Sequence, residues 1–254
     1  MQPGRAAGLV YALAAYVVAV RSLVYLVCFL ENFWVRRTID TGAVSPPLTA
    51  AAVDAGLFAL FALSHSAMAM PAAKRRIGRA LPAELERSTY VLVAGATLAL
   101  LFWRWRPLPA AVWHVAPPIA RGALRGLGAA GWLLAVVAMR TLGHARLFGL
   151  AQAWRWARGR EPQPSRLVER GIYRVIRHPL NLGFVLGIWG TPVMSAGRLL
   201  FAVVATLYVA VGMRLEEQHL RERFGSAWDG YRARVPALLP RVPGAAASRG
   251  SAAD

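Results

Sequence analysis

Charge and cysteine are both scarce in this 254-residue sequence. Only 17% of the residues are charged and 57% are hydrophobic, and the mean hydropathy is +0.42. Soluble domains are about 25% charged and about 45–50% apolar, so this composition excludes an ordinary soluble enzyme and a disordered chain. The single cysteine, Cys28, lies in an apolar run, which excludes a disulfide framework and a cysteine-based metal site. The composition therefore predicts an integral membrane protein.

Acidic residues and lysine are also rare. The sequence has 12 acidic against 30 basic residues, a net charge of +18, and Lys74 is its only lysine. A basic excess can indicate nucleic-acid binding, but here the arginines lie between apolar segments, as expected for the cytoplasmic loops of a membrane protein. The sequence also has no glycine-rich nucleotide loop, metal-ligand cluster or nucleophile elbow. We therefore expect a lipid environment, with no nucleic-acid partner and no metal.

Long apolar stretches define the expected architecture. A bilayer core of about 30 Å needs about 20 apolar residues per helix. The stretches that qualify are residues 8–30, 49–70, 89–105, 124–141 and 180–213. The last is too long for one span and is interrupted at Thr191-Pro192 and Gly197-Arg198, which predicts a short helical hairpin. We expect an all-α, polytopic transmembrane bundle of five or six segments, in which Arg21 faces protein or snorkels to the interface.

The basic residues give this bundle an orientation. With the N-terminus inside and six segments, 22 of the 30 basic residues fall on the inner side and seven on the outer side, and Arg21 lies between them. Because cytoplasmic loops are enriched in Lys and Arg, this split predicts that both termini face the cytoplasm of a bacterial inner membrane. Residues 1–241 are expected to form one membrane domain, followed by a disordered tail, 242–254, rich in Ala, Gly and Ser.

A polar cluster at the start of the hairpin has the features of an anion site. Arg177 and His178 precede Pro179, a residue that suits the first turn of a helix. Their side chains would lie beside free backbone N–H groups at the positive end of the helix dipole. Gly183 and Gly187 follow on one face, where they allow a helix or a flat ligand to approach the backbone. A basic flank followed by a helix-packing motif fits the sequence equally well.

Two adjacent carboxylates, Glu216 and Glu217, follow the last apolar stretch. If the helix continues to Gly225, they lie at the membrane surface about 100° apart around its axis. One could then bind a cation while the other pairs with Arg221, four residues on. The alternative is a solvated helix end with weak ion pairs.

Two histidines are candidate bases. His65 lies in the inner half of the second apolar stretch, where an ionisable residue is a functional candidate, although a hydrogen-bonded packing histidine is an equal alternative. His144 opens the basic, amphipathic stretch 144–156, which is expected to lie at the membrane interface. That stretch is either a surface anchor or a cofactor contact.

The C-terminal part of the sequence resembles a known superfamily. The matching residues are Arg177-His178-Pro179, Gly183, Glu216-Glu217, Phe224-Gly225, Tyr231 and Val235-Pro236. Together they resemble the integral-membrane methyltransferases related to isoprenylcysteine carboxyl methyltransferase and phospholipid N-methyltransferase. In that superfamily this region binds S-adenosylmethionine, which implies that the cofactor-binding part spans about residues 144–241.

Further motifs resemble those of the methanethiol S-methyltransferase family. The matching blocks are Ser64 to Pro71, Glu86 to Leu92, His144 with Leu147 to Leu150 and Gln152, and Trp189 to Met194. The similarity runs from about Leu23 to Pro240. Two positions depart from this family's usual residues: Ser64 stands for glutamine and Met70 for arginine. Asn181 stands where the superfamily's Arg-His-Pro-x-Tyr pattern has tyrosine.

The resemblance implies methyl transfer from S-adenosylmethionine to a small volatile thiol, with methanethiol converted to dimethyl sulfide. The implied cofactor site comprises Gln152, Tyr173, Arg177, His178, Asn181, Gly183, Glu216 and Glu217. Arg177 and His178 would bind the cofactor carboxylate, and one glutamate its ammonium or ribose. His65 or His144 would be the catalytic base that forms the thiolate. Two other functions stay open: methyl transfer to another lipophilic thiol, amine or carboxyl group, and a non-catalytic membrane protein on the same scaffold.

Overall fold

The computed structural model describes residues 3–164 and 166–240. The helices in this part of the chain are α1 (Pro3–Glu31), α2 (Pro47–Ala69), α3 (Pro71–Ala80), α4 (Glu86–Arg104), α5 (Pro118–Leu142), α6 (His144–Leu147), α7 (Leu150–Ala157), α8 (Pro179–Trp189), α9 (Ala196–Phe224) and α10 (Ser226–Arg234). Two 3-10 turns, η1 (Ala83–Leu85) and η2 (Gly171–Arg174), and two short strands, β1 (Ala111–His114) and β2 (Val193–Ser195), complete the fold.

Five of the described helices, α1, α2, α4, α5 and α9, are long and apolar enough to cross a membrane. A sixth apolar helix, α8, has only 11 residues. The predicted all-α transmembrane bundle is confirmed.

The helical hairpin formed by α8 and α9 is asymmetric. α8 extends for about 16 Å, whereas the 29 residues of α9 extend for about 43 Å. The expected short first arm is confirmed, and the second arm continues to Phe224 with Gly225 after it, as expected for a helix that runs past Glu216 and Glu217. Gly197-Arg198 does not interrupt the helix, because the Ser195 hydroxyl accepts a hydrogen bond from the Arg198 N–H and caps the start of α9.

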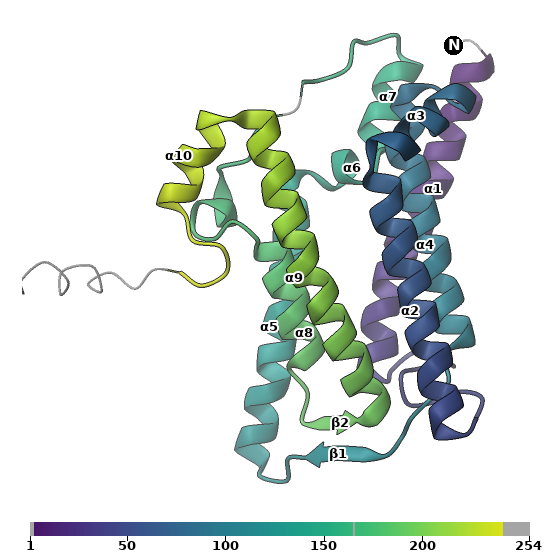
Figure 1. Cartoon of the computed structure of the whole chain (residues 1–254), viewed down its shortest axis with the longest axis vertical. Helices are drawn as coiled ribbons and strands as arrows, with labels where there is room; N and C mark the ends of the chain where they lie inside the picture. Colours follow the sequence, from purple (N-terminus) through teal and green to yellow (C-terminus); the bar gives the residue numbers. More distant parts are fainter. Residues whose placement is uncertain (1–2, 165, 241–254) are drawn as a thin grey trace, which may run out of the picture.

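The chain reaches the far end of the bundle through α8 and the extended residues after it. There β2 pairs antiparallel with β1, with Trp113 opposite Met194. Figure 1 shows this two-stranded sheet at one pole of the bundle, and α3, α6, α7, α10 and the N-terminus at the other. We call these the β pole and the basic pole. The described beginning and end of the chain lie at the same pole, as expected for six segments.

Glycines bring α8 into close contact with α5. A Cβ atom on Gly183 would lie 2.7 Å from the Ala135 nitrogen, and one on Gly190 would lie 2.3 Å from the Gly128 nitrogen. The glycine face of α8 is therefore covered by α5, as the helix-packing interpretation proposed. Gly183 packs against Gly131 and Ala135 of α5, so its close approach serves helix packing, and a cofactor contact at Gly183 stays a prediction.

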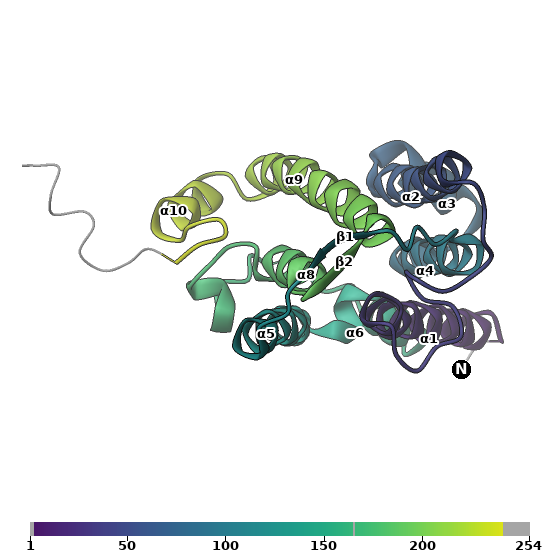
Figure 2. The ribbon, with the colours of Figure 1, turned by 90° about the horizontal axis from the view of Figure 1, so that it is seen from below.

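Viewed along the bundle, α1, α2 and α4 form one group and α5, α8 and α9 another (Figure 2). One apolar core joins the two groups. In it Phe58 of α2 packs edge-on against Phe201 of α9, which also contacts Trp105, the residue after α4. Such aromatic pairs contribute beyond their buried area. The core lies toward the β pole, so the two groups are anchored together there.

Two arginines occupy positions that composition alone does not indicate. Arg198, expected to be an outer-loop charge, is 2% exposed and forms an ion pair with Glu31 at 3.2 Å. Arg21 lies on the exposed surface of α1, between the exposed side chains of Val17 and Val24. Of the two positions expected for Arg21, the one facing protein is wrong, which leaves snorkelling.

Candidate functional site

The predicted cluster forms at the basic pole, where α8 begins beside α9. Arg177 and His178 immediately precede α8, and Glu217 reaches them from α9. The Arg177 Nη2 atom lies 2.8 Å from Glu217 Oε1, and the His178 Nε2 atom lies 3.0 Å from the same oxygen. Glu216 Oε2 lies 3.6 Å from His178 Nδ1. Four predicted site residues are therefore brought together by two elements about 40 residues apart in the sequence.

Arg177 is the structural centre of this cluster. Its side chain is 8% exposed, and beyond Glu217 it donates to the backbone carbonyls of Arg232 and Val235. Its own backbone N–H donates to the Pro236 carbonyl. Arg177 thus fastens α10 and the chain that follows it to the start of α8. The expected direct contact between Arg177 and a cofactor carboxylate is not supported, because protein acceptors surround the guanidinium group.

The expected anion site at the N-terminus of α8 is also only partly present. The N–H groups of Arg177 and His178 donate to the carbonyls of Pro236 and Ala237, so neither is free. Asn181, in the first turn of α8, is half-buried, and its side chain forms no hydrogen bond with any residue of the described chain. Its amide and the backbone N–H groups of the first turn of α8, Leu180 and Asn181, are the available donors at this helix end.

His178 is the titratable base of the cluster, and its side chain is 4% exposed. Burial disfavours the charged imidazolium, but the hydrogen bonds and charges of Glu216 and Glu217 outweigh this effect and raise the pKa of His178 above its ordinary value. Glu217 also faces Arg177 and, at 3.8 Å, Arg232. The two carboxylates therefore favour the charged form of the imidazole.

The two glutamates differ in exposure and in the number of protein groups that they contact. The Glu217 side chain is 20% exposed and contacts Arg177 and His178, whereas the Glu216 side chain is 55% exposed. The expected pairing of one glutamate with Arg221 is wrong, because Arg221 pairs with Asp229 at 3.2 Å. Glu216 is the carboxylate with capacity for a ligand.

Tyr173 and Tyr231 close the cluster on the side of η2. The Tyr231 hydroxyl donates to the Tyr173 carbonyl at 2.7 Å. Burial, and then the charge of Glu216, raise the pKa of Tyr173, so its hydroxyl remains neutral. Burial also raises the pKa of Tyr231 to about 12. The Tyr231 O–H is used within the protein, and the neutral Tyr173 hydroxyl is the phenol donor that remains on this side.

A second polar group surrounds His65 where α2, α4 and α9 meet. The Tyr208 hydroxyl lies 2.8 Å from His65 Nδ1, and the Tyr90 hydroxyl lies 2.7 Å from Nε2. Ser66 Oγ is 3.3 Å from the Tyr208 hydroxyl. The charge of Glu216 contributes, as the smallest of several effects, to the electrostatic environment of the Tyr90 hydroxyl.

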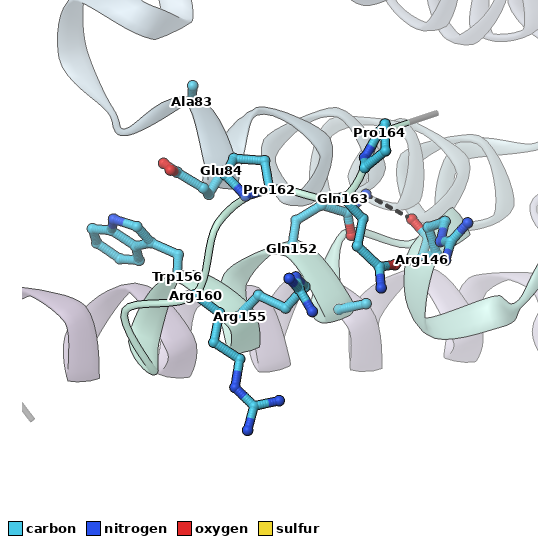
Figure 3. A pocket seen from close by; sticks show the side chains of 11 residues that line it. Ala83, Glu84, Arg146, Gln152, Arg155, Trp156, Arg160, Pro162, Gln163 and Pro164 are labelled. Atoms are coloured by element: carbon cyan, nitrogen blue, oxygen red, sulfur yellow. Dashed lines mark hydrogen bonds between the residues drawn. The ribbon is translucent and has the colours of Figure 1, made fainter. Parts of the chain in front are cut away.

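His144 and Gln152 lie elsewhere. The His144 Nδ1 atom is 3.0 Å from the Tyr16 hydroxyl, in contact with α1. Gln152 lies on α7 and donates to the Arg146 carbonyl at 3.0 Å, in the wall of a separate cavity (Figure 3). The structure does not bring either residue to the α8 cluster.

Sequence reasoning assigned no role in the site to Tyr90, Tyr208 or Ser66. Tyr90 and Ser66 belong to blocks that resemble the methanethiol S-methyltransferase family, and this was the available signal for them. Tyr208 lies 143 residues from its partner His65, and no local pattern indicates that contact.

Comparison with known proteins gives matches along nearly the whole chain. Residues 125–227 match a family model described as phospholipid methyltransferase. Methanethiol S-methyltransferase 2 of Bradyrhizobium diazoefficiens is 42% identical, covering 94% of this chain and 92% of its own length. Methanethiol S-methyltransferase of Mycobacterium tuberculosis is 39% identical over 91% of this chain and 95% of its own. Nurim of Xenopus laevis is 31% identical over 65% of this chain and 61% of its own. No solved structure matches this chain.

Proposed function

This chain belongs to the methanethiol S-methyltransferase family, and we propose that it methylates methanethiol with S-adenosylmethionine, forming dimethyl sulfide. The observation that carries the proposal is the position of Glu216. This half-exposed carboxylate lies on α9, 3.6 Å from His178, and the same helix carries Tyr208, whose hydroxyl contacts His65. We infer that the acid for the donor's cation is on Glu216 and the base for the thiol is on His65.

The residues present fit S-adenosylmethionine. Glu216 is the available carboxylate for its ammonium or ribose hydroxyls, and the Asn181 amide is an available donor for its carboxylate. Glu217 and Arg177 fix the position of His178, which in turn orients Glu216. When bound, S-adenosylmethionine supplies a methyl group on a positively charged sulfur. The remaining task for the protein is alignment and exclusion of water.

Of the two candidate bases, the contacts favour His65 over His144. Both imidazole nitrogens of His65 contact phenol hydroxyls, those of Tyr208 and Tyr90. A thiol that donates to one of these hydroxyls can therefore pass its proton through the phenol to His65. The sulfur is left as thiolate, the form that attacks a methyl group, and His65 holds the proton as an imidazolium.

Headspace detection of dimethyl sulfide from purified enzyme, methanethiol and S-adenosylmethionine tests this proposal. His65→Ala should reduce the rate about 10²- to 10⁴-fold, the usual contribution of a general base. Tyr90→Phe and Tyr208→Phe should each reduce the rate less, because one hydroxyl remains. The matched control is His144→Ala, which should retain the wild-type rate. Equal losses in His65→Ala and His144→Ala would remove His65 as the specific base.

A second acceptor class is favoured by one observation, the match of residues 125–227 to the phospholipid methyltransferase model. An amine of a membrane phospholipid would then accept the methyl group. Wild-type enzyme offered phosphatidylethanolamine vesicles and labelled S-adenosylmethionine would produce methylated lipid in that case. We expect the label in dimethyl sulfide when methanethiol is present, and no transfer to the lipid.

We also propose that the basic pole faces the cytoplasm, since it carries most of the arginines. Reporter fusions after Pro46 and after Pro118, both near the β pole, should report the outer side of the membrane. A cytoplasmic signal at either position would overturn this orientation.

A further inference from the structure

A cavity of about 270 Å³ lies at the basic pole, between η1, α7 and the chain just before residue 165. Figure 3 shows its side chains, among them those of Gln152 and Trp156 from α7 and of Glu84 from η1. Neither the α8 cluster nor the His65 group contributes to its wall. The lining of this cavity therefore cannot be explained by the proposed methyl-transfer site.

The cavity is rich in positive charge. Three arginines, Arg146, Arg155 and Arg160, line it, and Glu84 is the one carboxylate among its described lining residues. None of the three arginines pairs with a carboxylate of the described chain. Arg146 donates to the Gln163 side chain, Arg155 donates to the Glu161 carbonyl, and Arg160 stacks on Trp154. Each guanidinium group has five N–H donors, so donors remain for an anion.

Gln152 provides a second observation that points to a ligand in this cavity. Its amide nitrogen donates to the Arg146 carbonyl, but its Oε1 atom is buried and accepts no hydrogen bond from the described residues. A buried acceptor without a donor is costly. A ligand that brings both an anionic group and a hydrogen-bond donor would satisfy the arginines and Gln152 together.

The surroundings indicate where such a ligand comes from. The rest of the wall is apolar, with Ala83, Ala151 and the Trp156 ring. Helix α7 carries Trp154, which is exposed, and two exposed arginines stack on it, as in helices that lie at a lipid–water interface. Phosphates of cytoplasmic-leaflet lipids bind basic pockets at this depth.

We propose that this cavity binds the headgroup of an anionic phospholipid. The phosphodiester contacts Arg146, Arg155 and Arg160, since guanidinium groups match phosphate oxygens in a bidentate geometry. A headgroup hydroxyl, as in phosphatidylglycerol, donates to Gln152 Oε1. The lipid then joins η1, α7 and the chain that follows α7, and it stabilises this side of the basic pole.

Thermal unfolding of the detergent-solubilised full chain, titrated with dioctanoyl phosphatidylglycerol, measures this binding. We expect the unfolding temperature to rise with lipid concentration. Arg160→Gln should increase the apparent dissociation constant about tenfold through loss of one charge-assisted contact. The matched control is Arg158→Gln, which removes the same charge beside the same Trp154 ring but lies outside the cavity. It should leave the constant unchanged.

Additional variants and ligands make the test specific. Arg146→Gln with Arg155→Gln should abolish the lipid effect, and Arg160→Gln keeps the test valid if that double variant does not fold. Dioctanoyl phosphatidylcholine and inorganic phosphate should stabilise the protein much less than phosphatidylglycerol. Three results would overturn the proposal: an equal effect of phosphatidylcholine, an equal effect of free phosphate, or equal losses in Arg158→Gln and Arg160→Gln.

Discussion

Two buried arginines, one at each pole, form clusters that resemble each other in construction. Arg177 at the basic pole pairs with Glu217 and donates to the carbonyls of two residues beyond α9. Arg198 at the β pole pairs with Glu31 and donates to the carbonyls of Leu30 and Ile188. Each guanidinium group joins elements that are distant in the sequence. Both arginines therefore hold the bundle together.

The clusters differ in what remains after these bonds are made. At the β pole, Glu31 also accepts from the Trp132 indole at 3.2 Å, and every partner comes from the protein. At the basic pole, a second acid, Glu216, is half-exposed, and within the described part of the chain its ion-pair partner is His178, at 3.6 Å. The Arg198 cluster is therefore a purely structural ion pair. The Arg177 cluster has the same kind of ion pair and, in addition, a carboxylate that is exposed enough to bind a ligand.

The sharpest test of this comparison is the removal of Arg198. Arg198→Met should destabilise the protein by about 3–5 kcal/mol, since Glu31 is left without its cation and α1 loses its tie to α9. The measurement is unfolding of purified protein in detergent. Arg125→Met, at the same pole but on the exposed surface of α5, is the matched control and should leave stability unchanged. A variant as stable as wild type would show that the Arg198 ion pair is not structural.

The next test separates the two adjacent acids. Glu216→Gln should weaken S-adenosylmethionine binding about ten- to a hundredfold, by loss of a charge-assisted hydrogen bond of about 1.5–3 kcal/mol, and should lower the unfolding temperature less than Glu217→Gln does. Glu217→Gln should lower the unfolding temperature, because Arg177 and His178 lose their shared partner. His178→Ala should weaken cofactor binding as well. Calorimetric titration and thermal unfolding of each variant provide both readouts.

A single pattern would contradict this division of roles. If Glu216→Gln lost stability and kept its cofactor affinity, while Glu217→Gln did the reverse, the two acids would have exchanged roles. Unchanged affinity in both Glu216→Gln and His178→Ala would remove the cofactor from this cluster.

The sequence predicts the membrane segments well because each is determined locally. Long apolar runs form helices in lipid whatever they pack against, so the bundle and the short α8 followed from composition. Arg198 was expected in an outer loop, and its burial was not predictable because its partners Leu30 and Glu31 are more than 160 residues away. In a sequence, an arginine within an apolar run is interpreted as the end of a membrane segment unless a buried acidic partner is known.

The sequence predicted which residues form the cluster, but it did not predict the hydrogen bonds and ion pairs among them. Arg177, His178 and the two glutamates stand out because polar residues are rare in this chain. Which glutamate pairs with Arg177 depends on how α9 is rotated about its axis relative to the start of α8. That rotation is set by tertiary packing and cannot be derived from the local sequence. The chain after α10 was the other unpredictable element, since its carbonyls occupy the N–H groups assigned to a ligand.

A smaller effect concerns the proton on His178. The two glutamates raise the pKa of His178, so its charge stabilises the folded state. For a raised pKa this stabilisation is complete below the unfolded value, about 6.5, and is lost as the pH rises through the folded value. Wild type should therefore exceed His178→Gln in unfolding temperature most at about pH 6 and progressively less toward alkaline pH. A constant difference across this range would show that His178 acts through packing alone.

The smallest expected effect is at Asn181, where this chain departs from the Arg-His-Pro-x-Tyr pattern of the superfamily that it resembles. The residue lies in the first turn of α8 and is half-buried, and its amide is unpaired in the described chain. Asparagine keeps a hydrogen-bond donor but leaves the volume of a ring unfilled. Asn181→Tyr should therefore preserve or modestly improve cofactor affinity and dimethyl sulfide production. A repacked pocket would instead lose about 1–3 kcal/mol to strain. Loss of activity with unchanged stability would show that the basic pole has diverged around asparagine, and that residue roles must be read from this structure rather than from the family pattern.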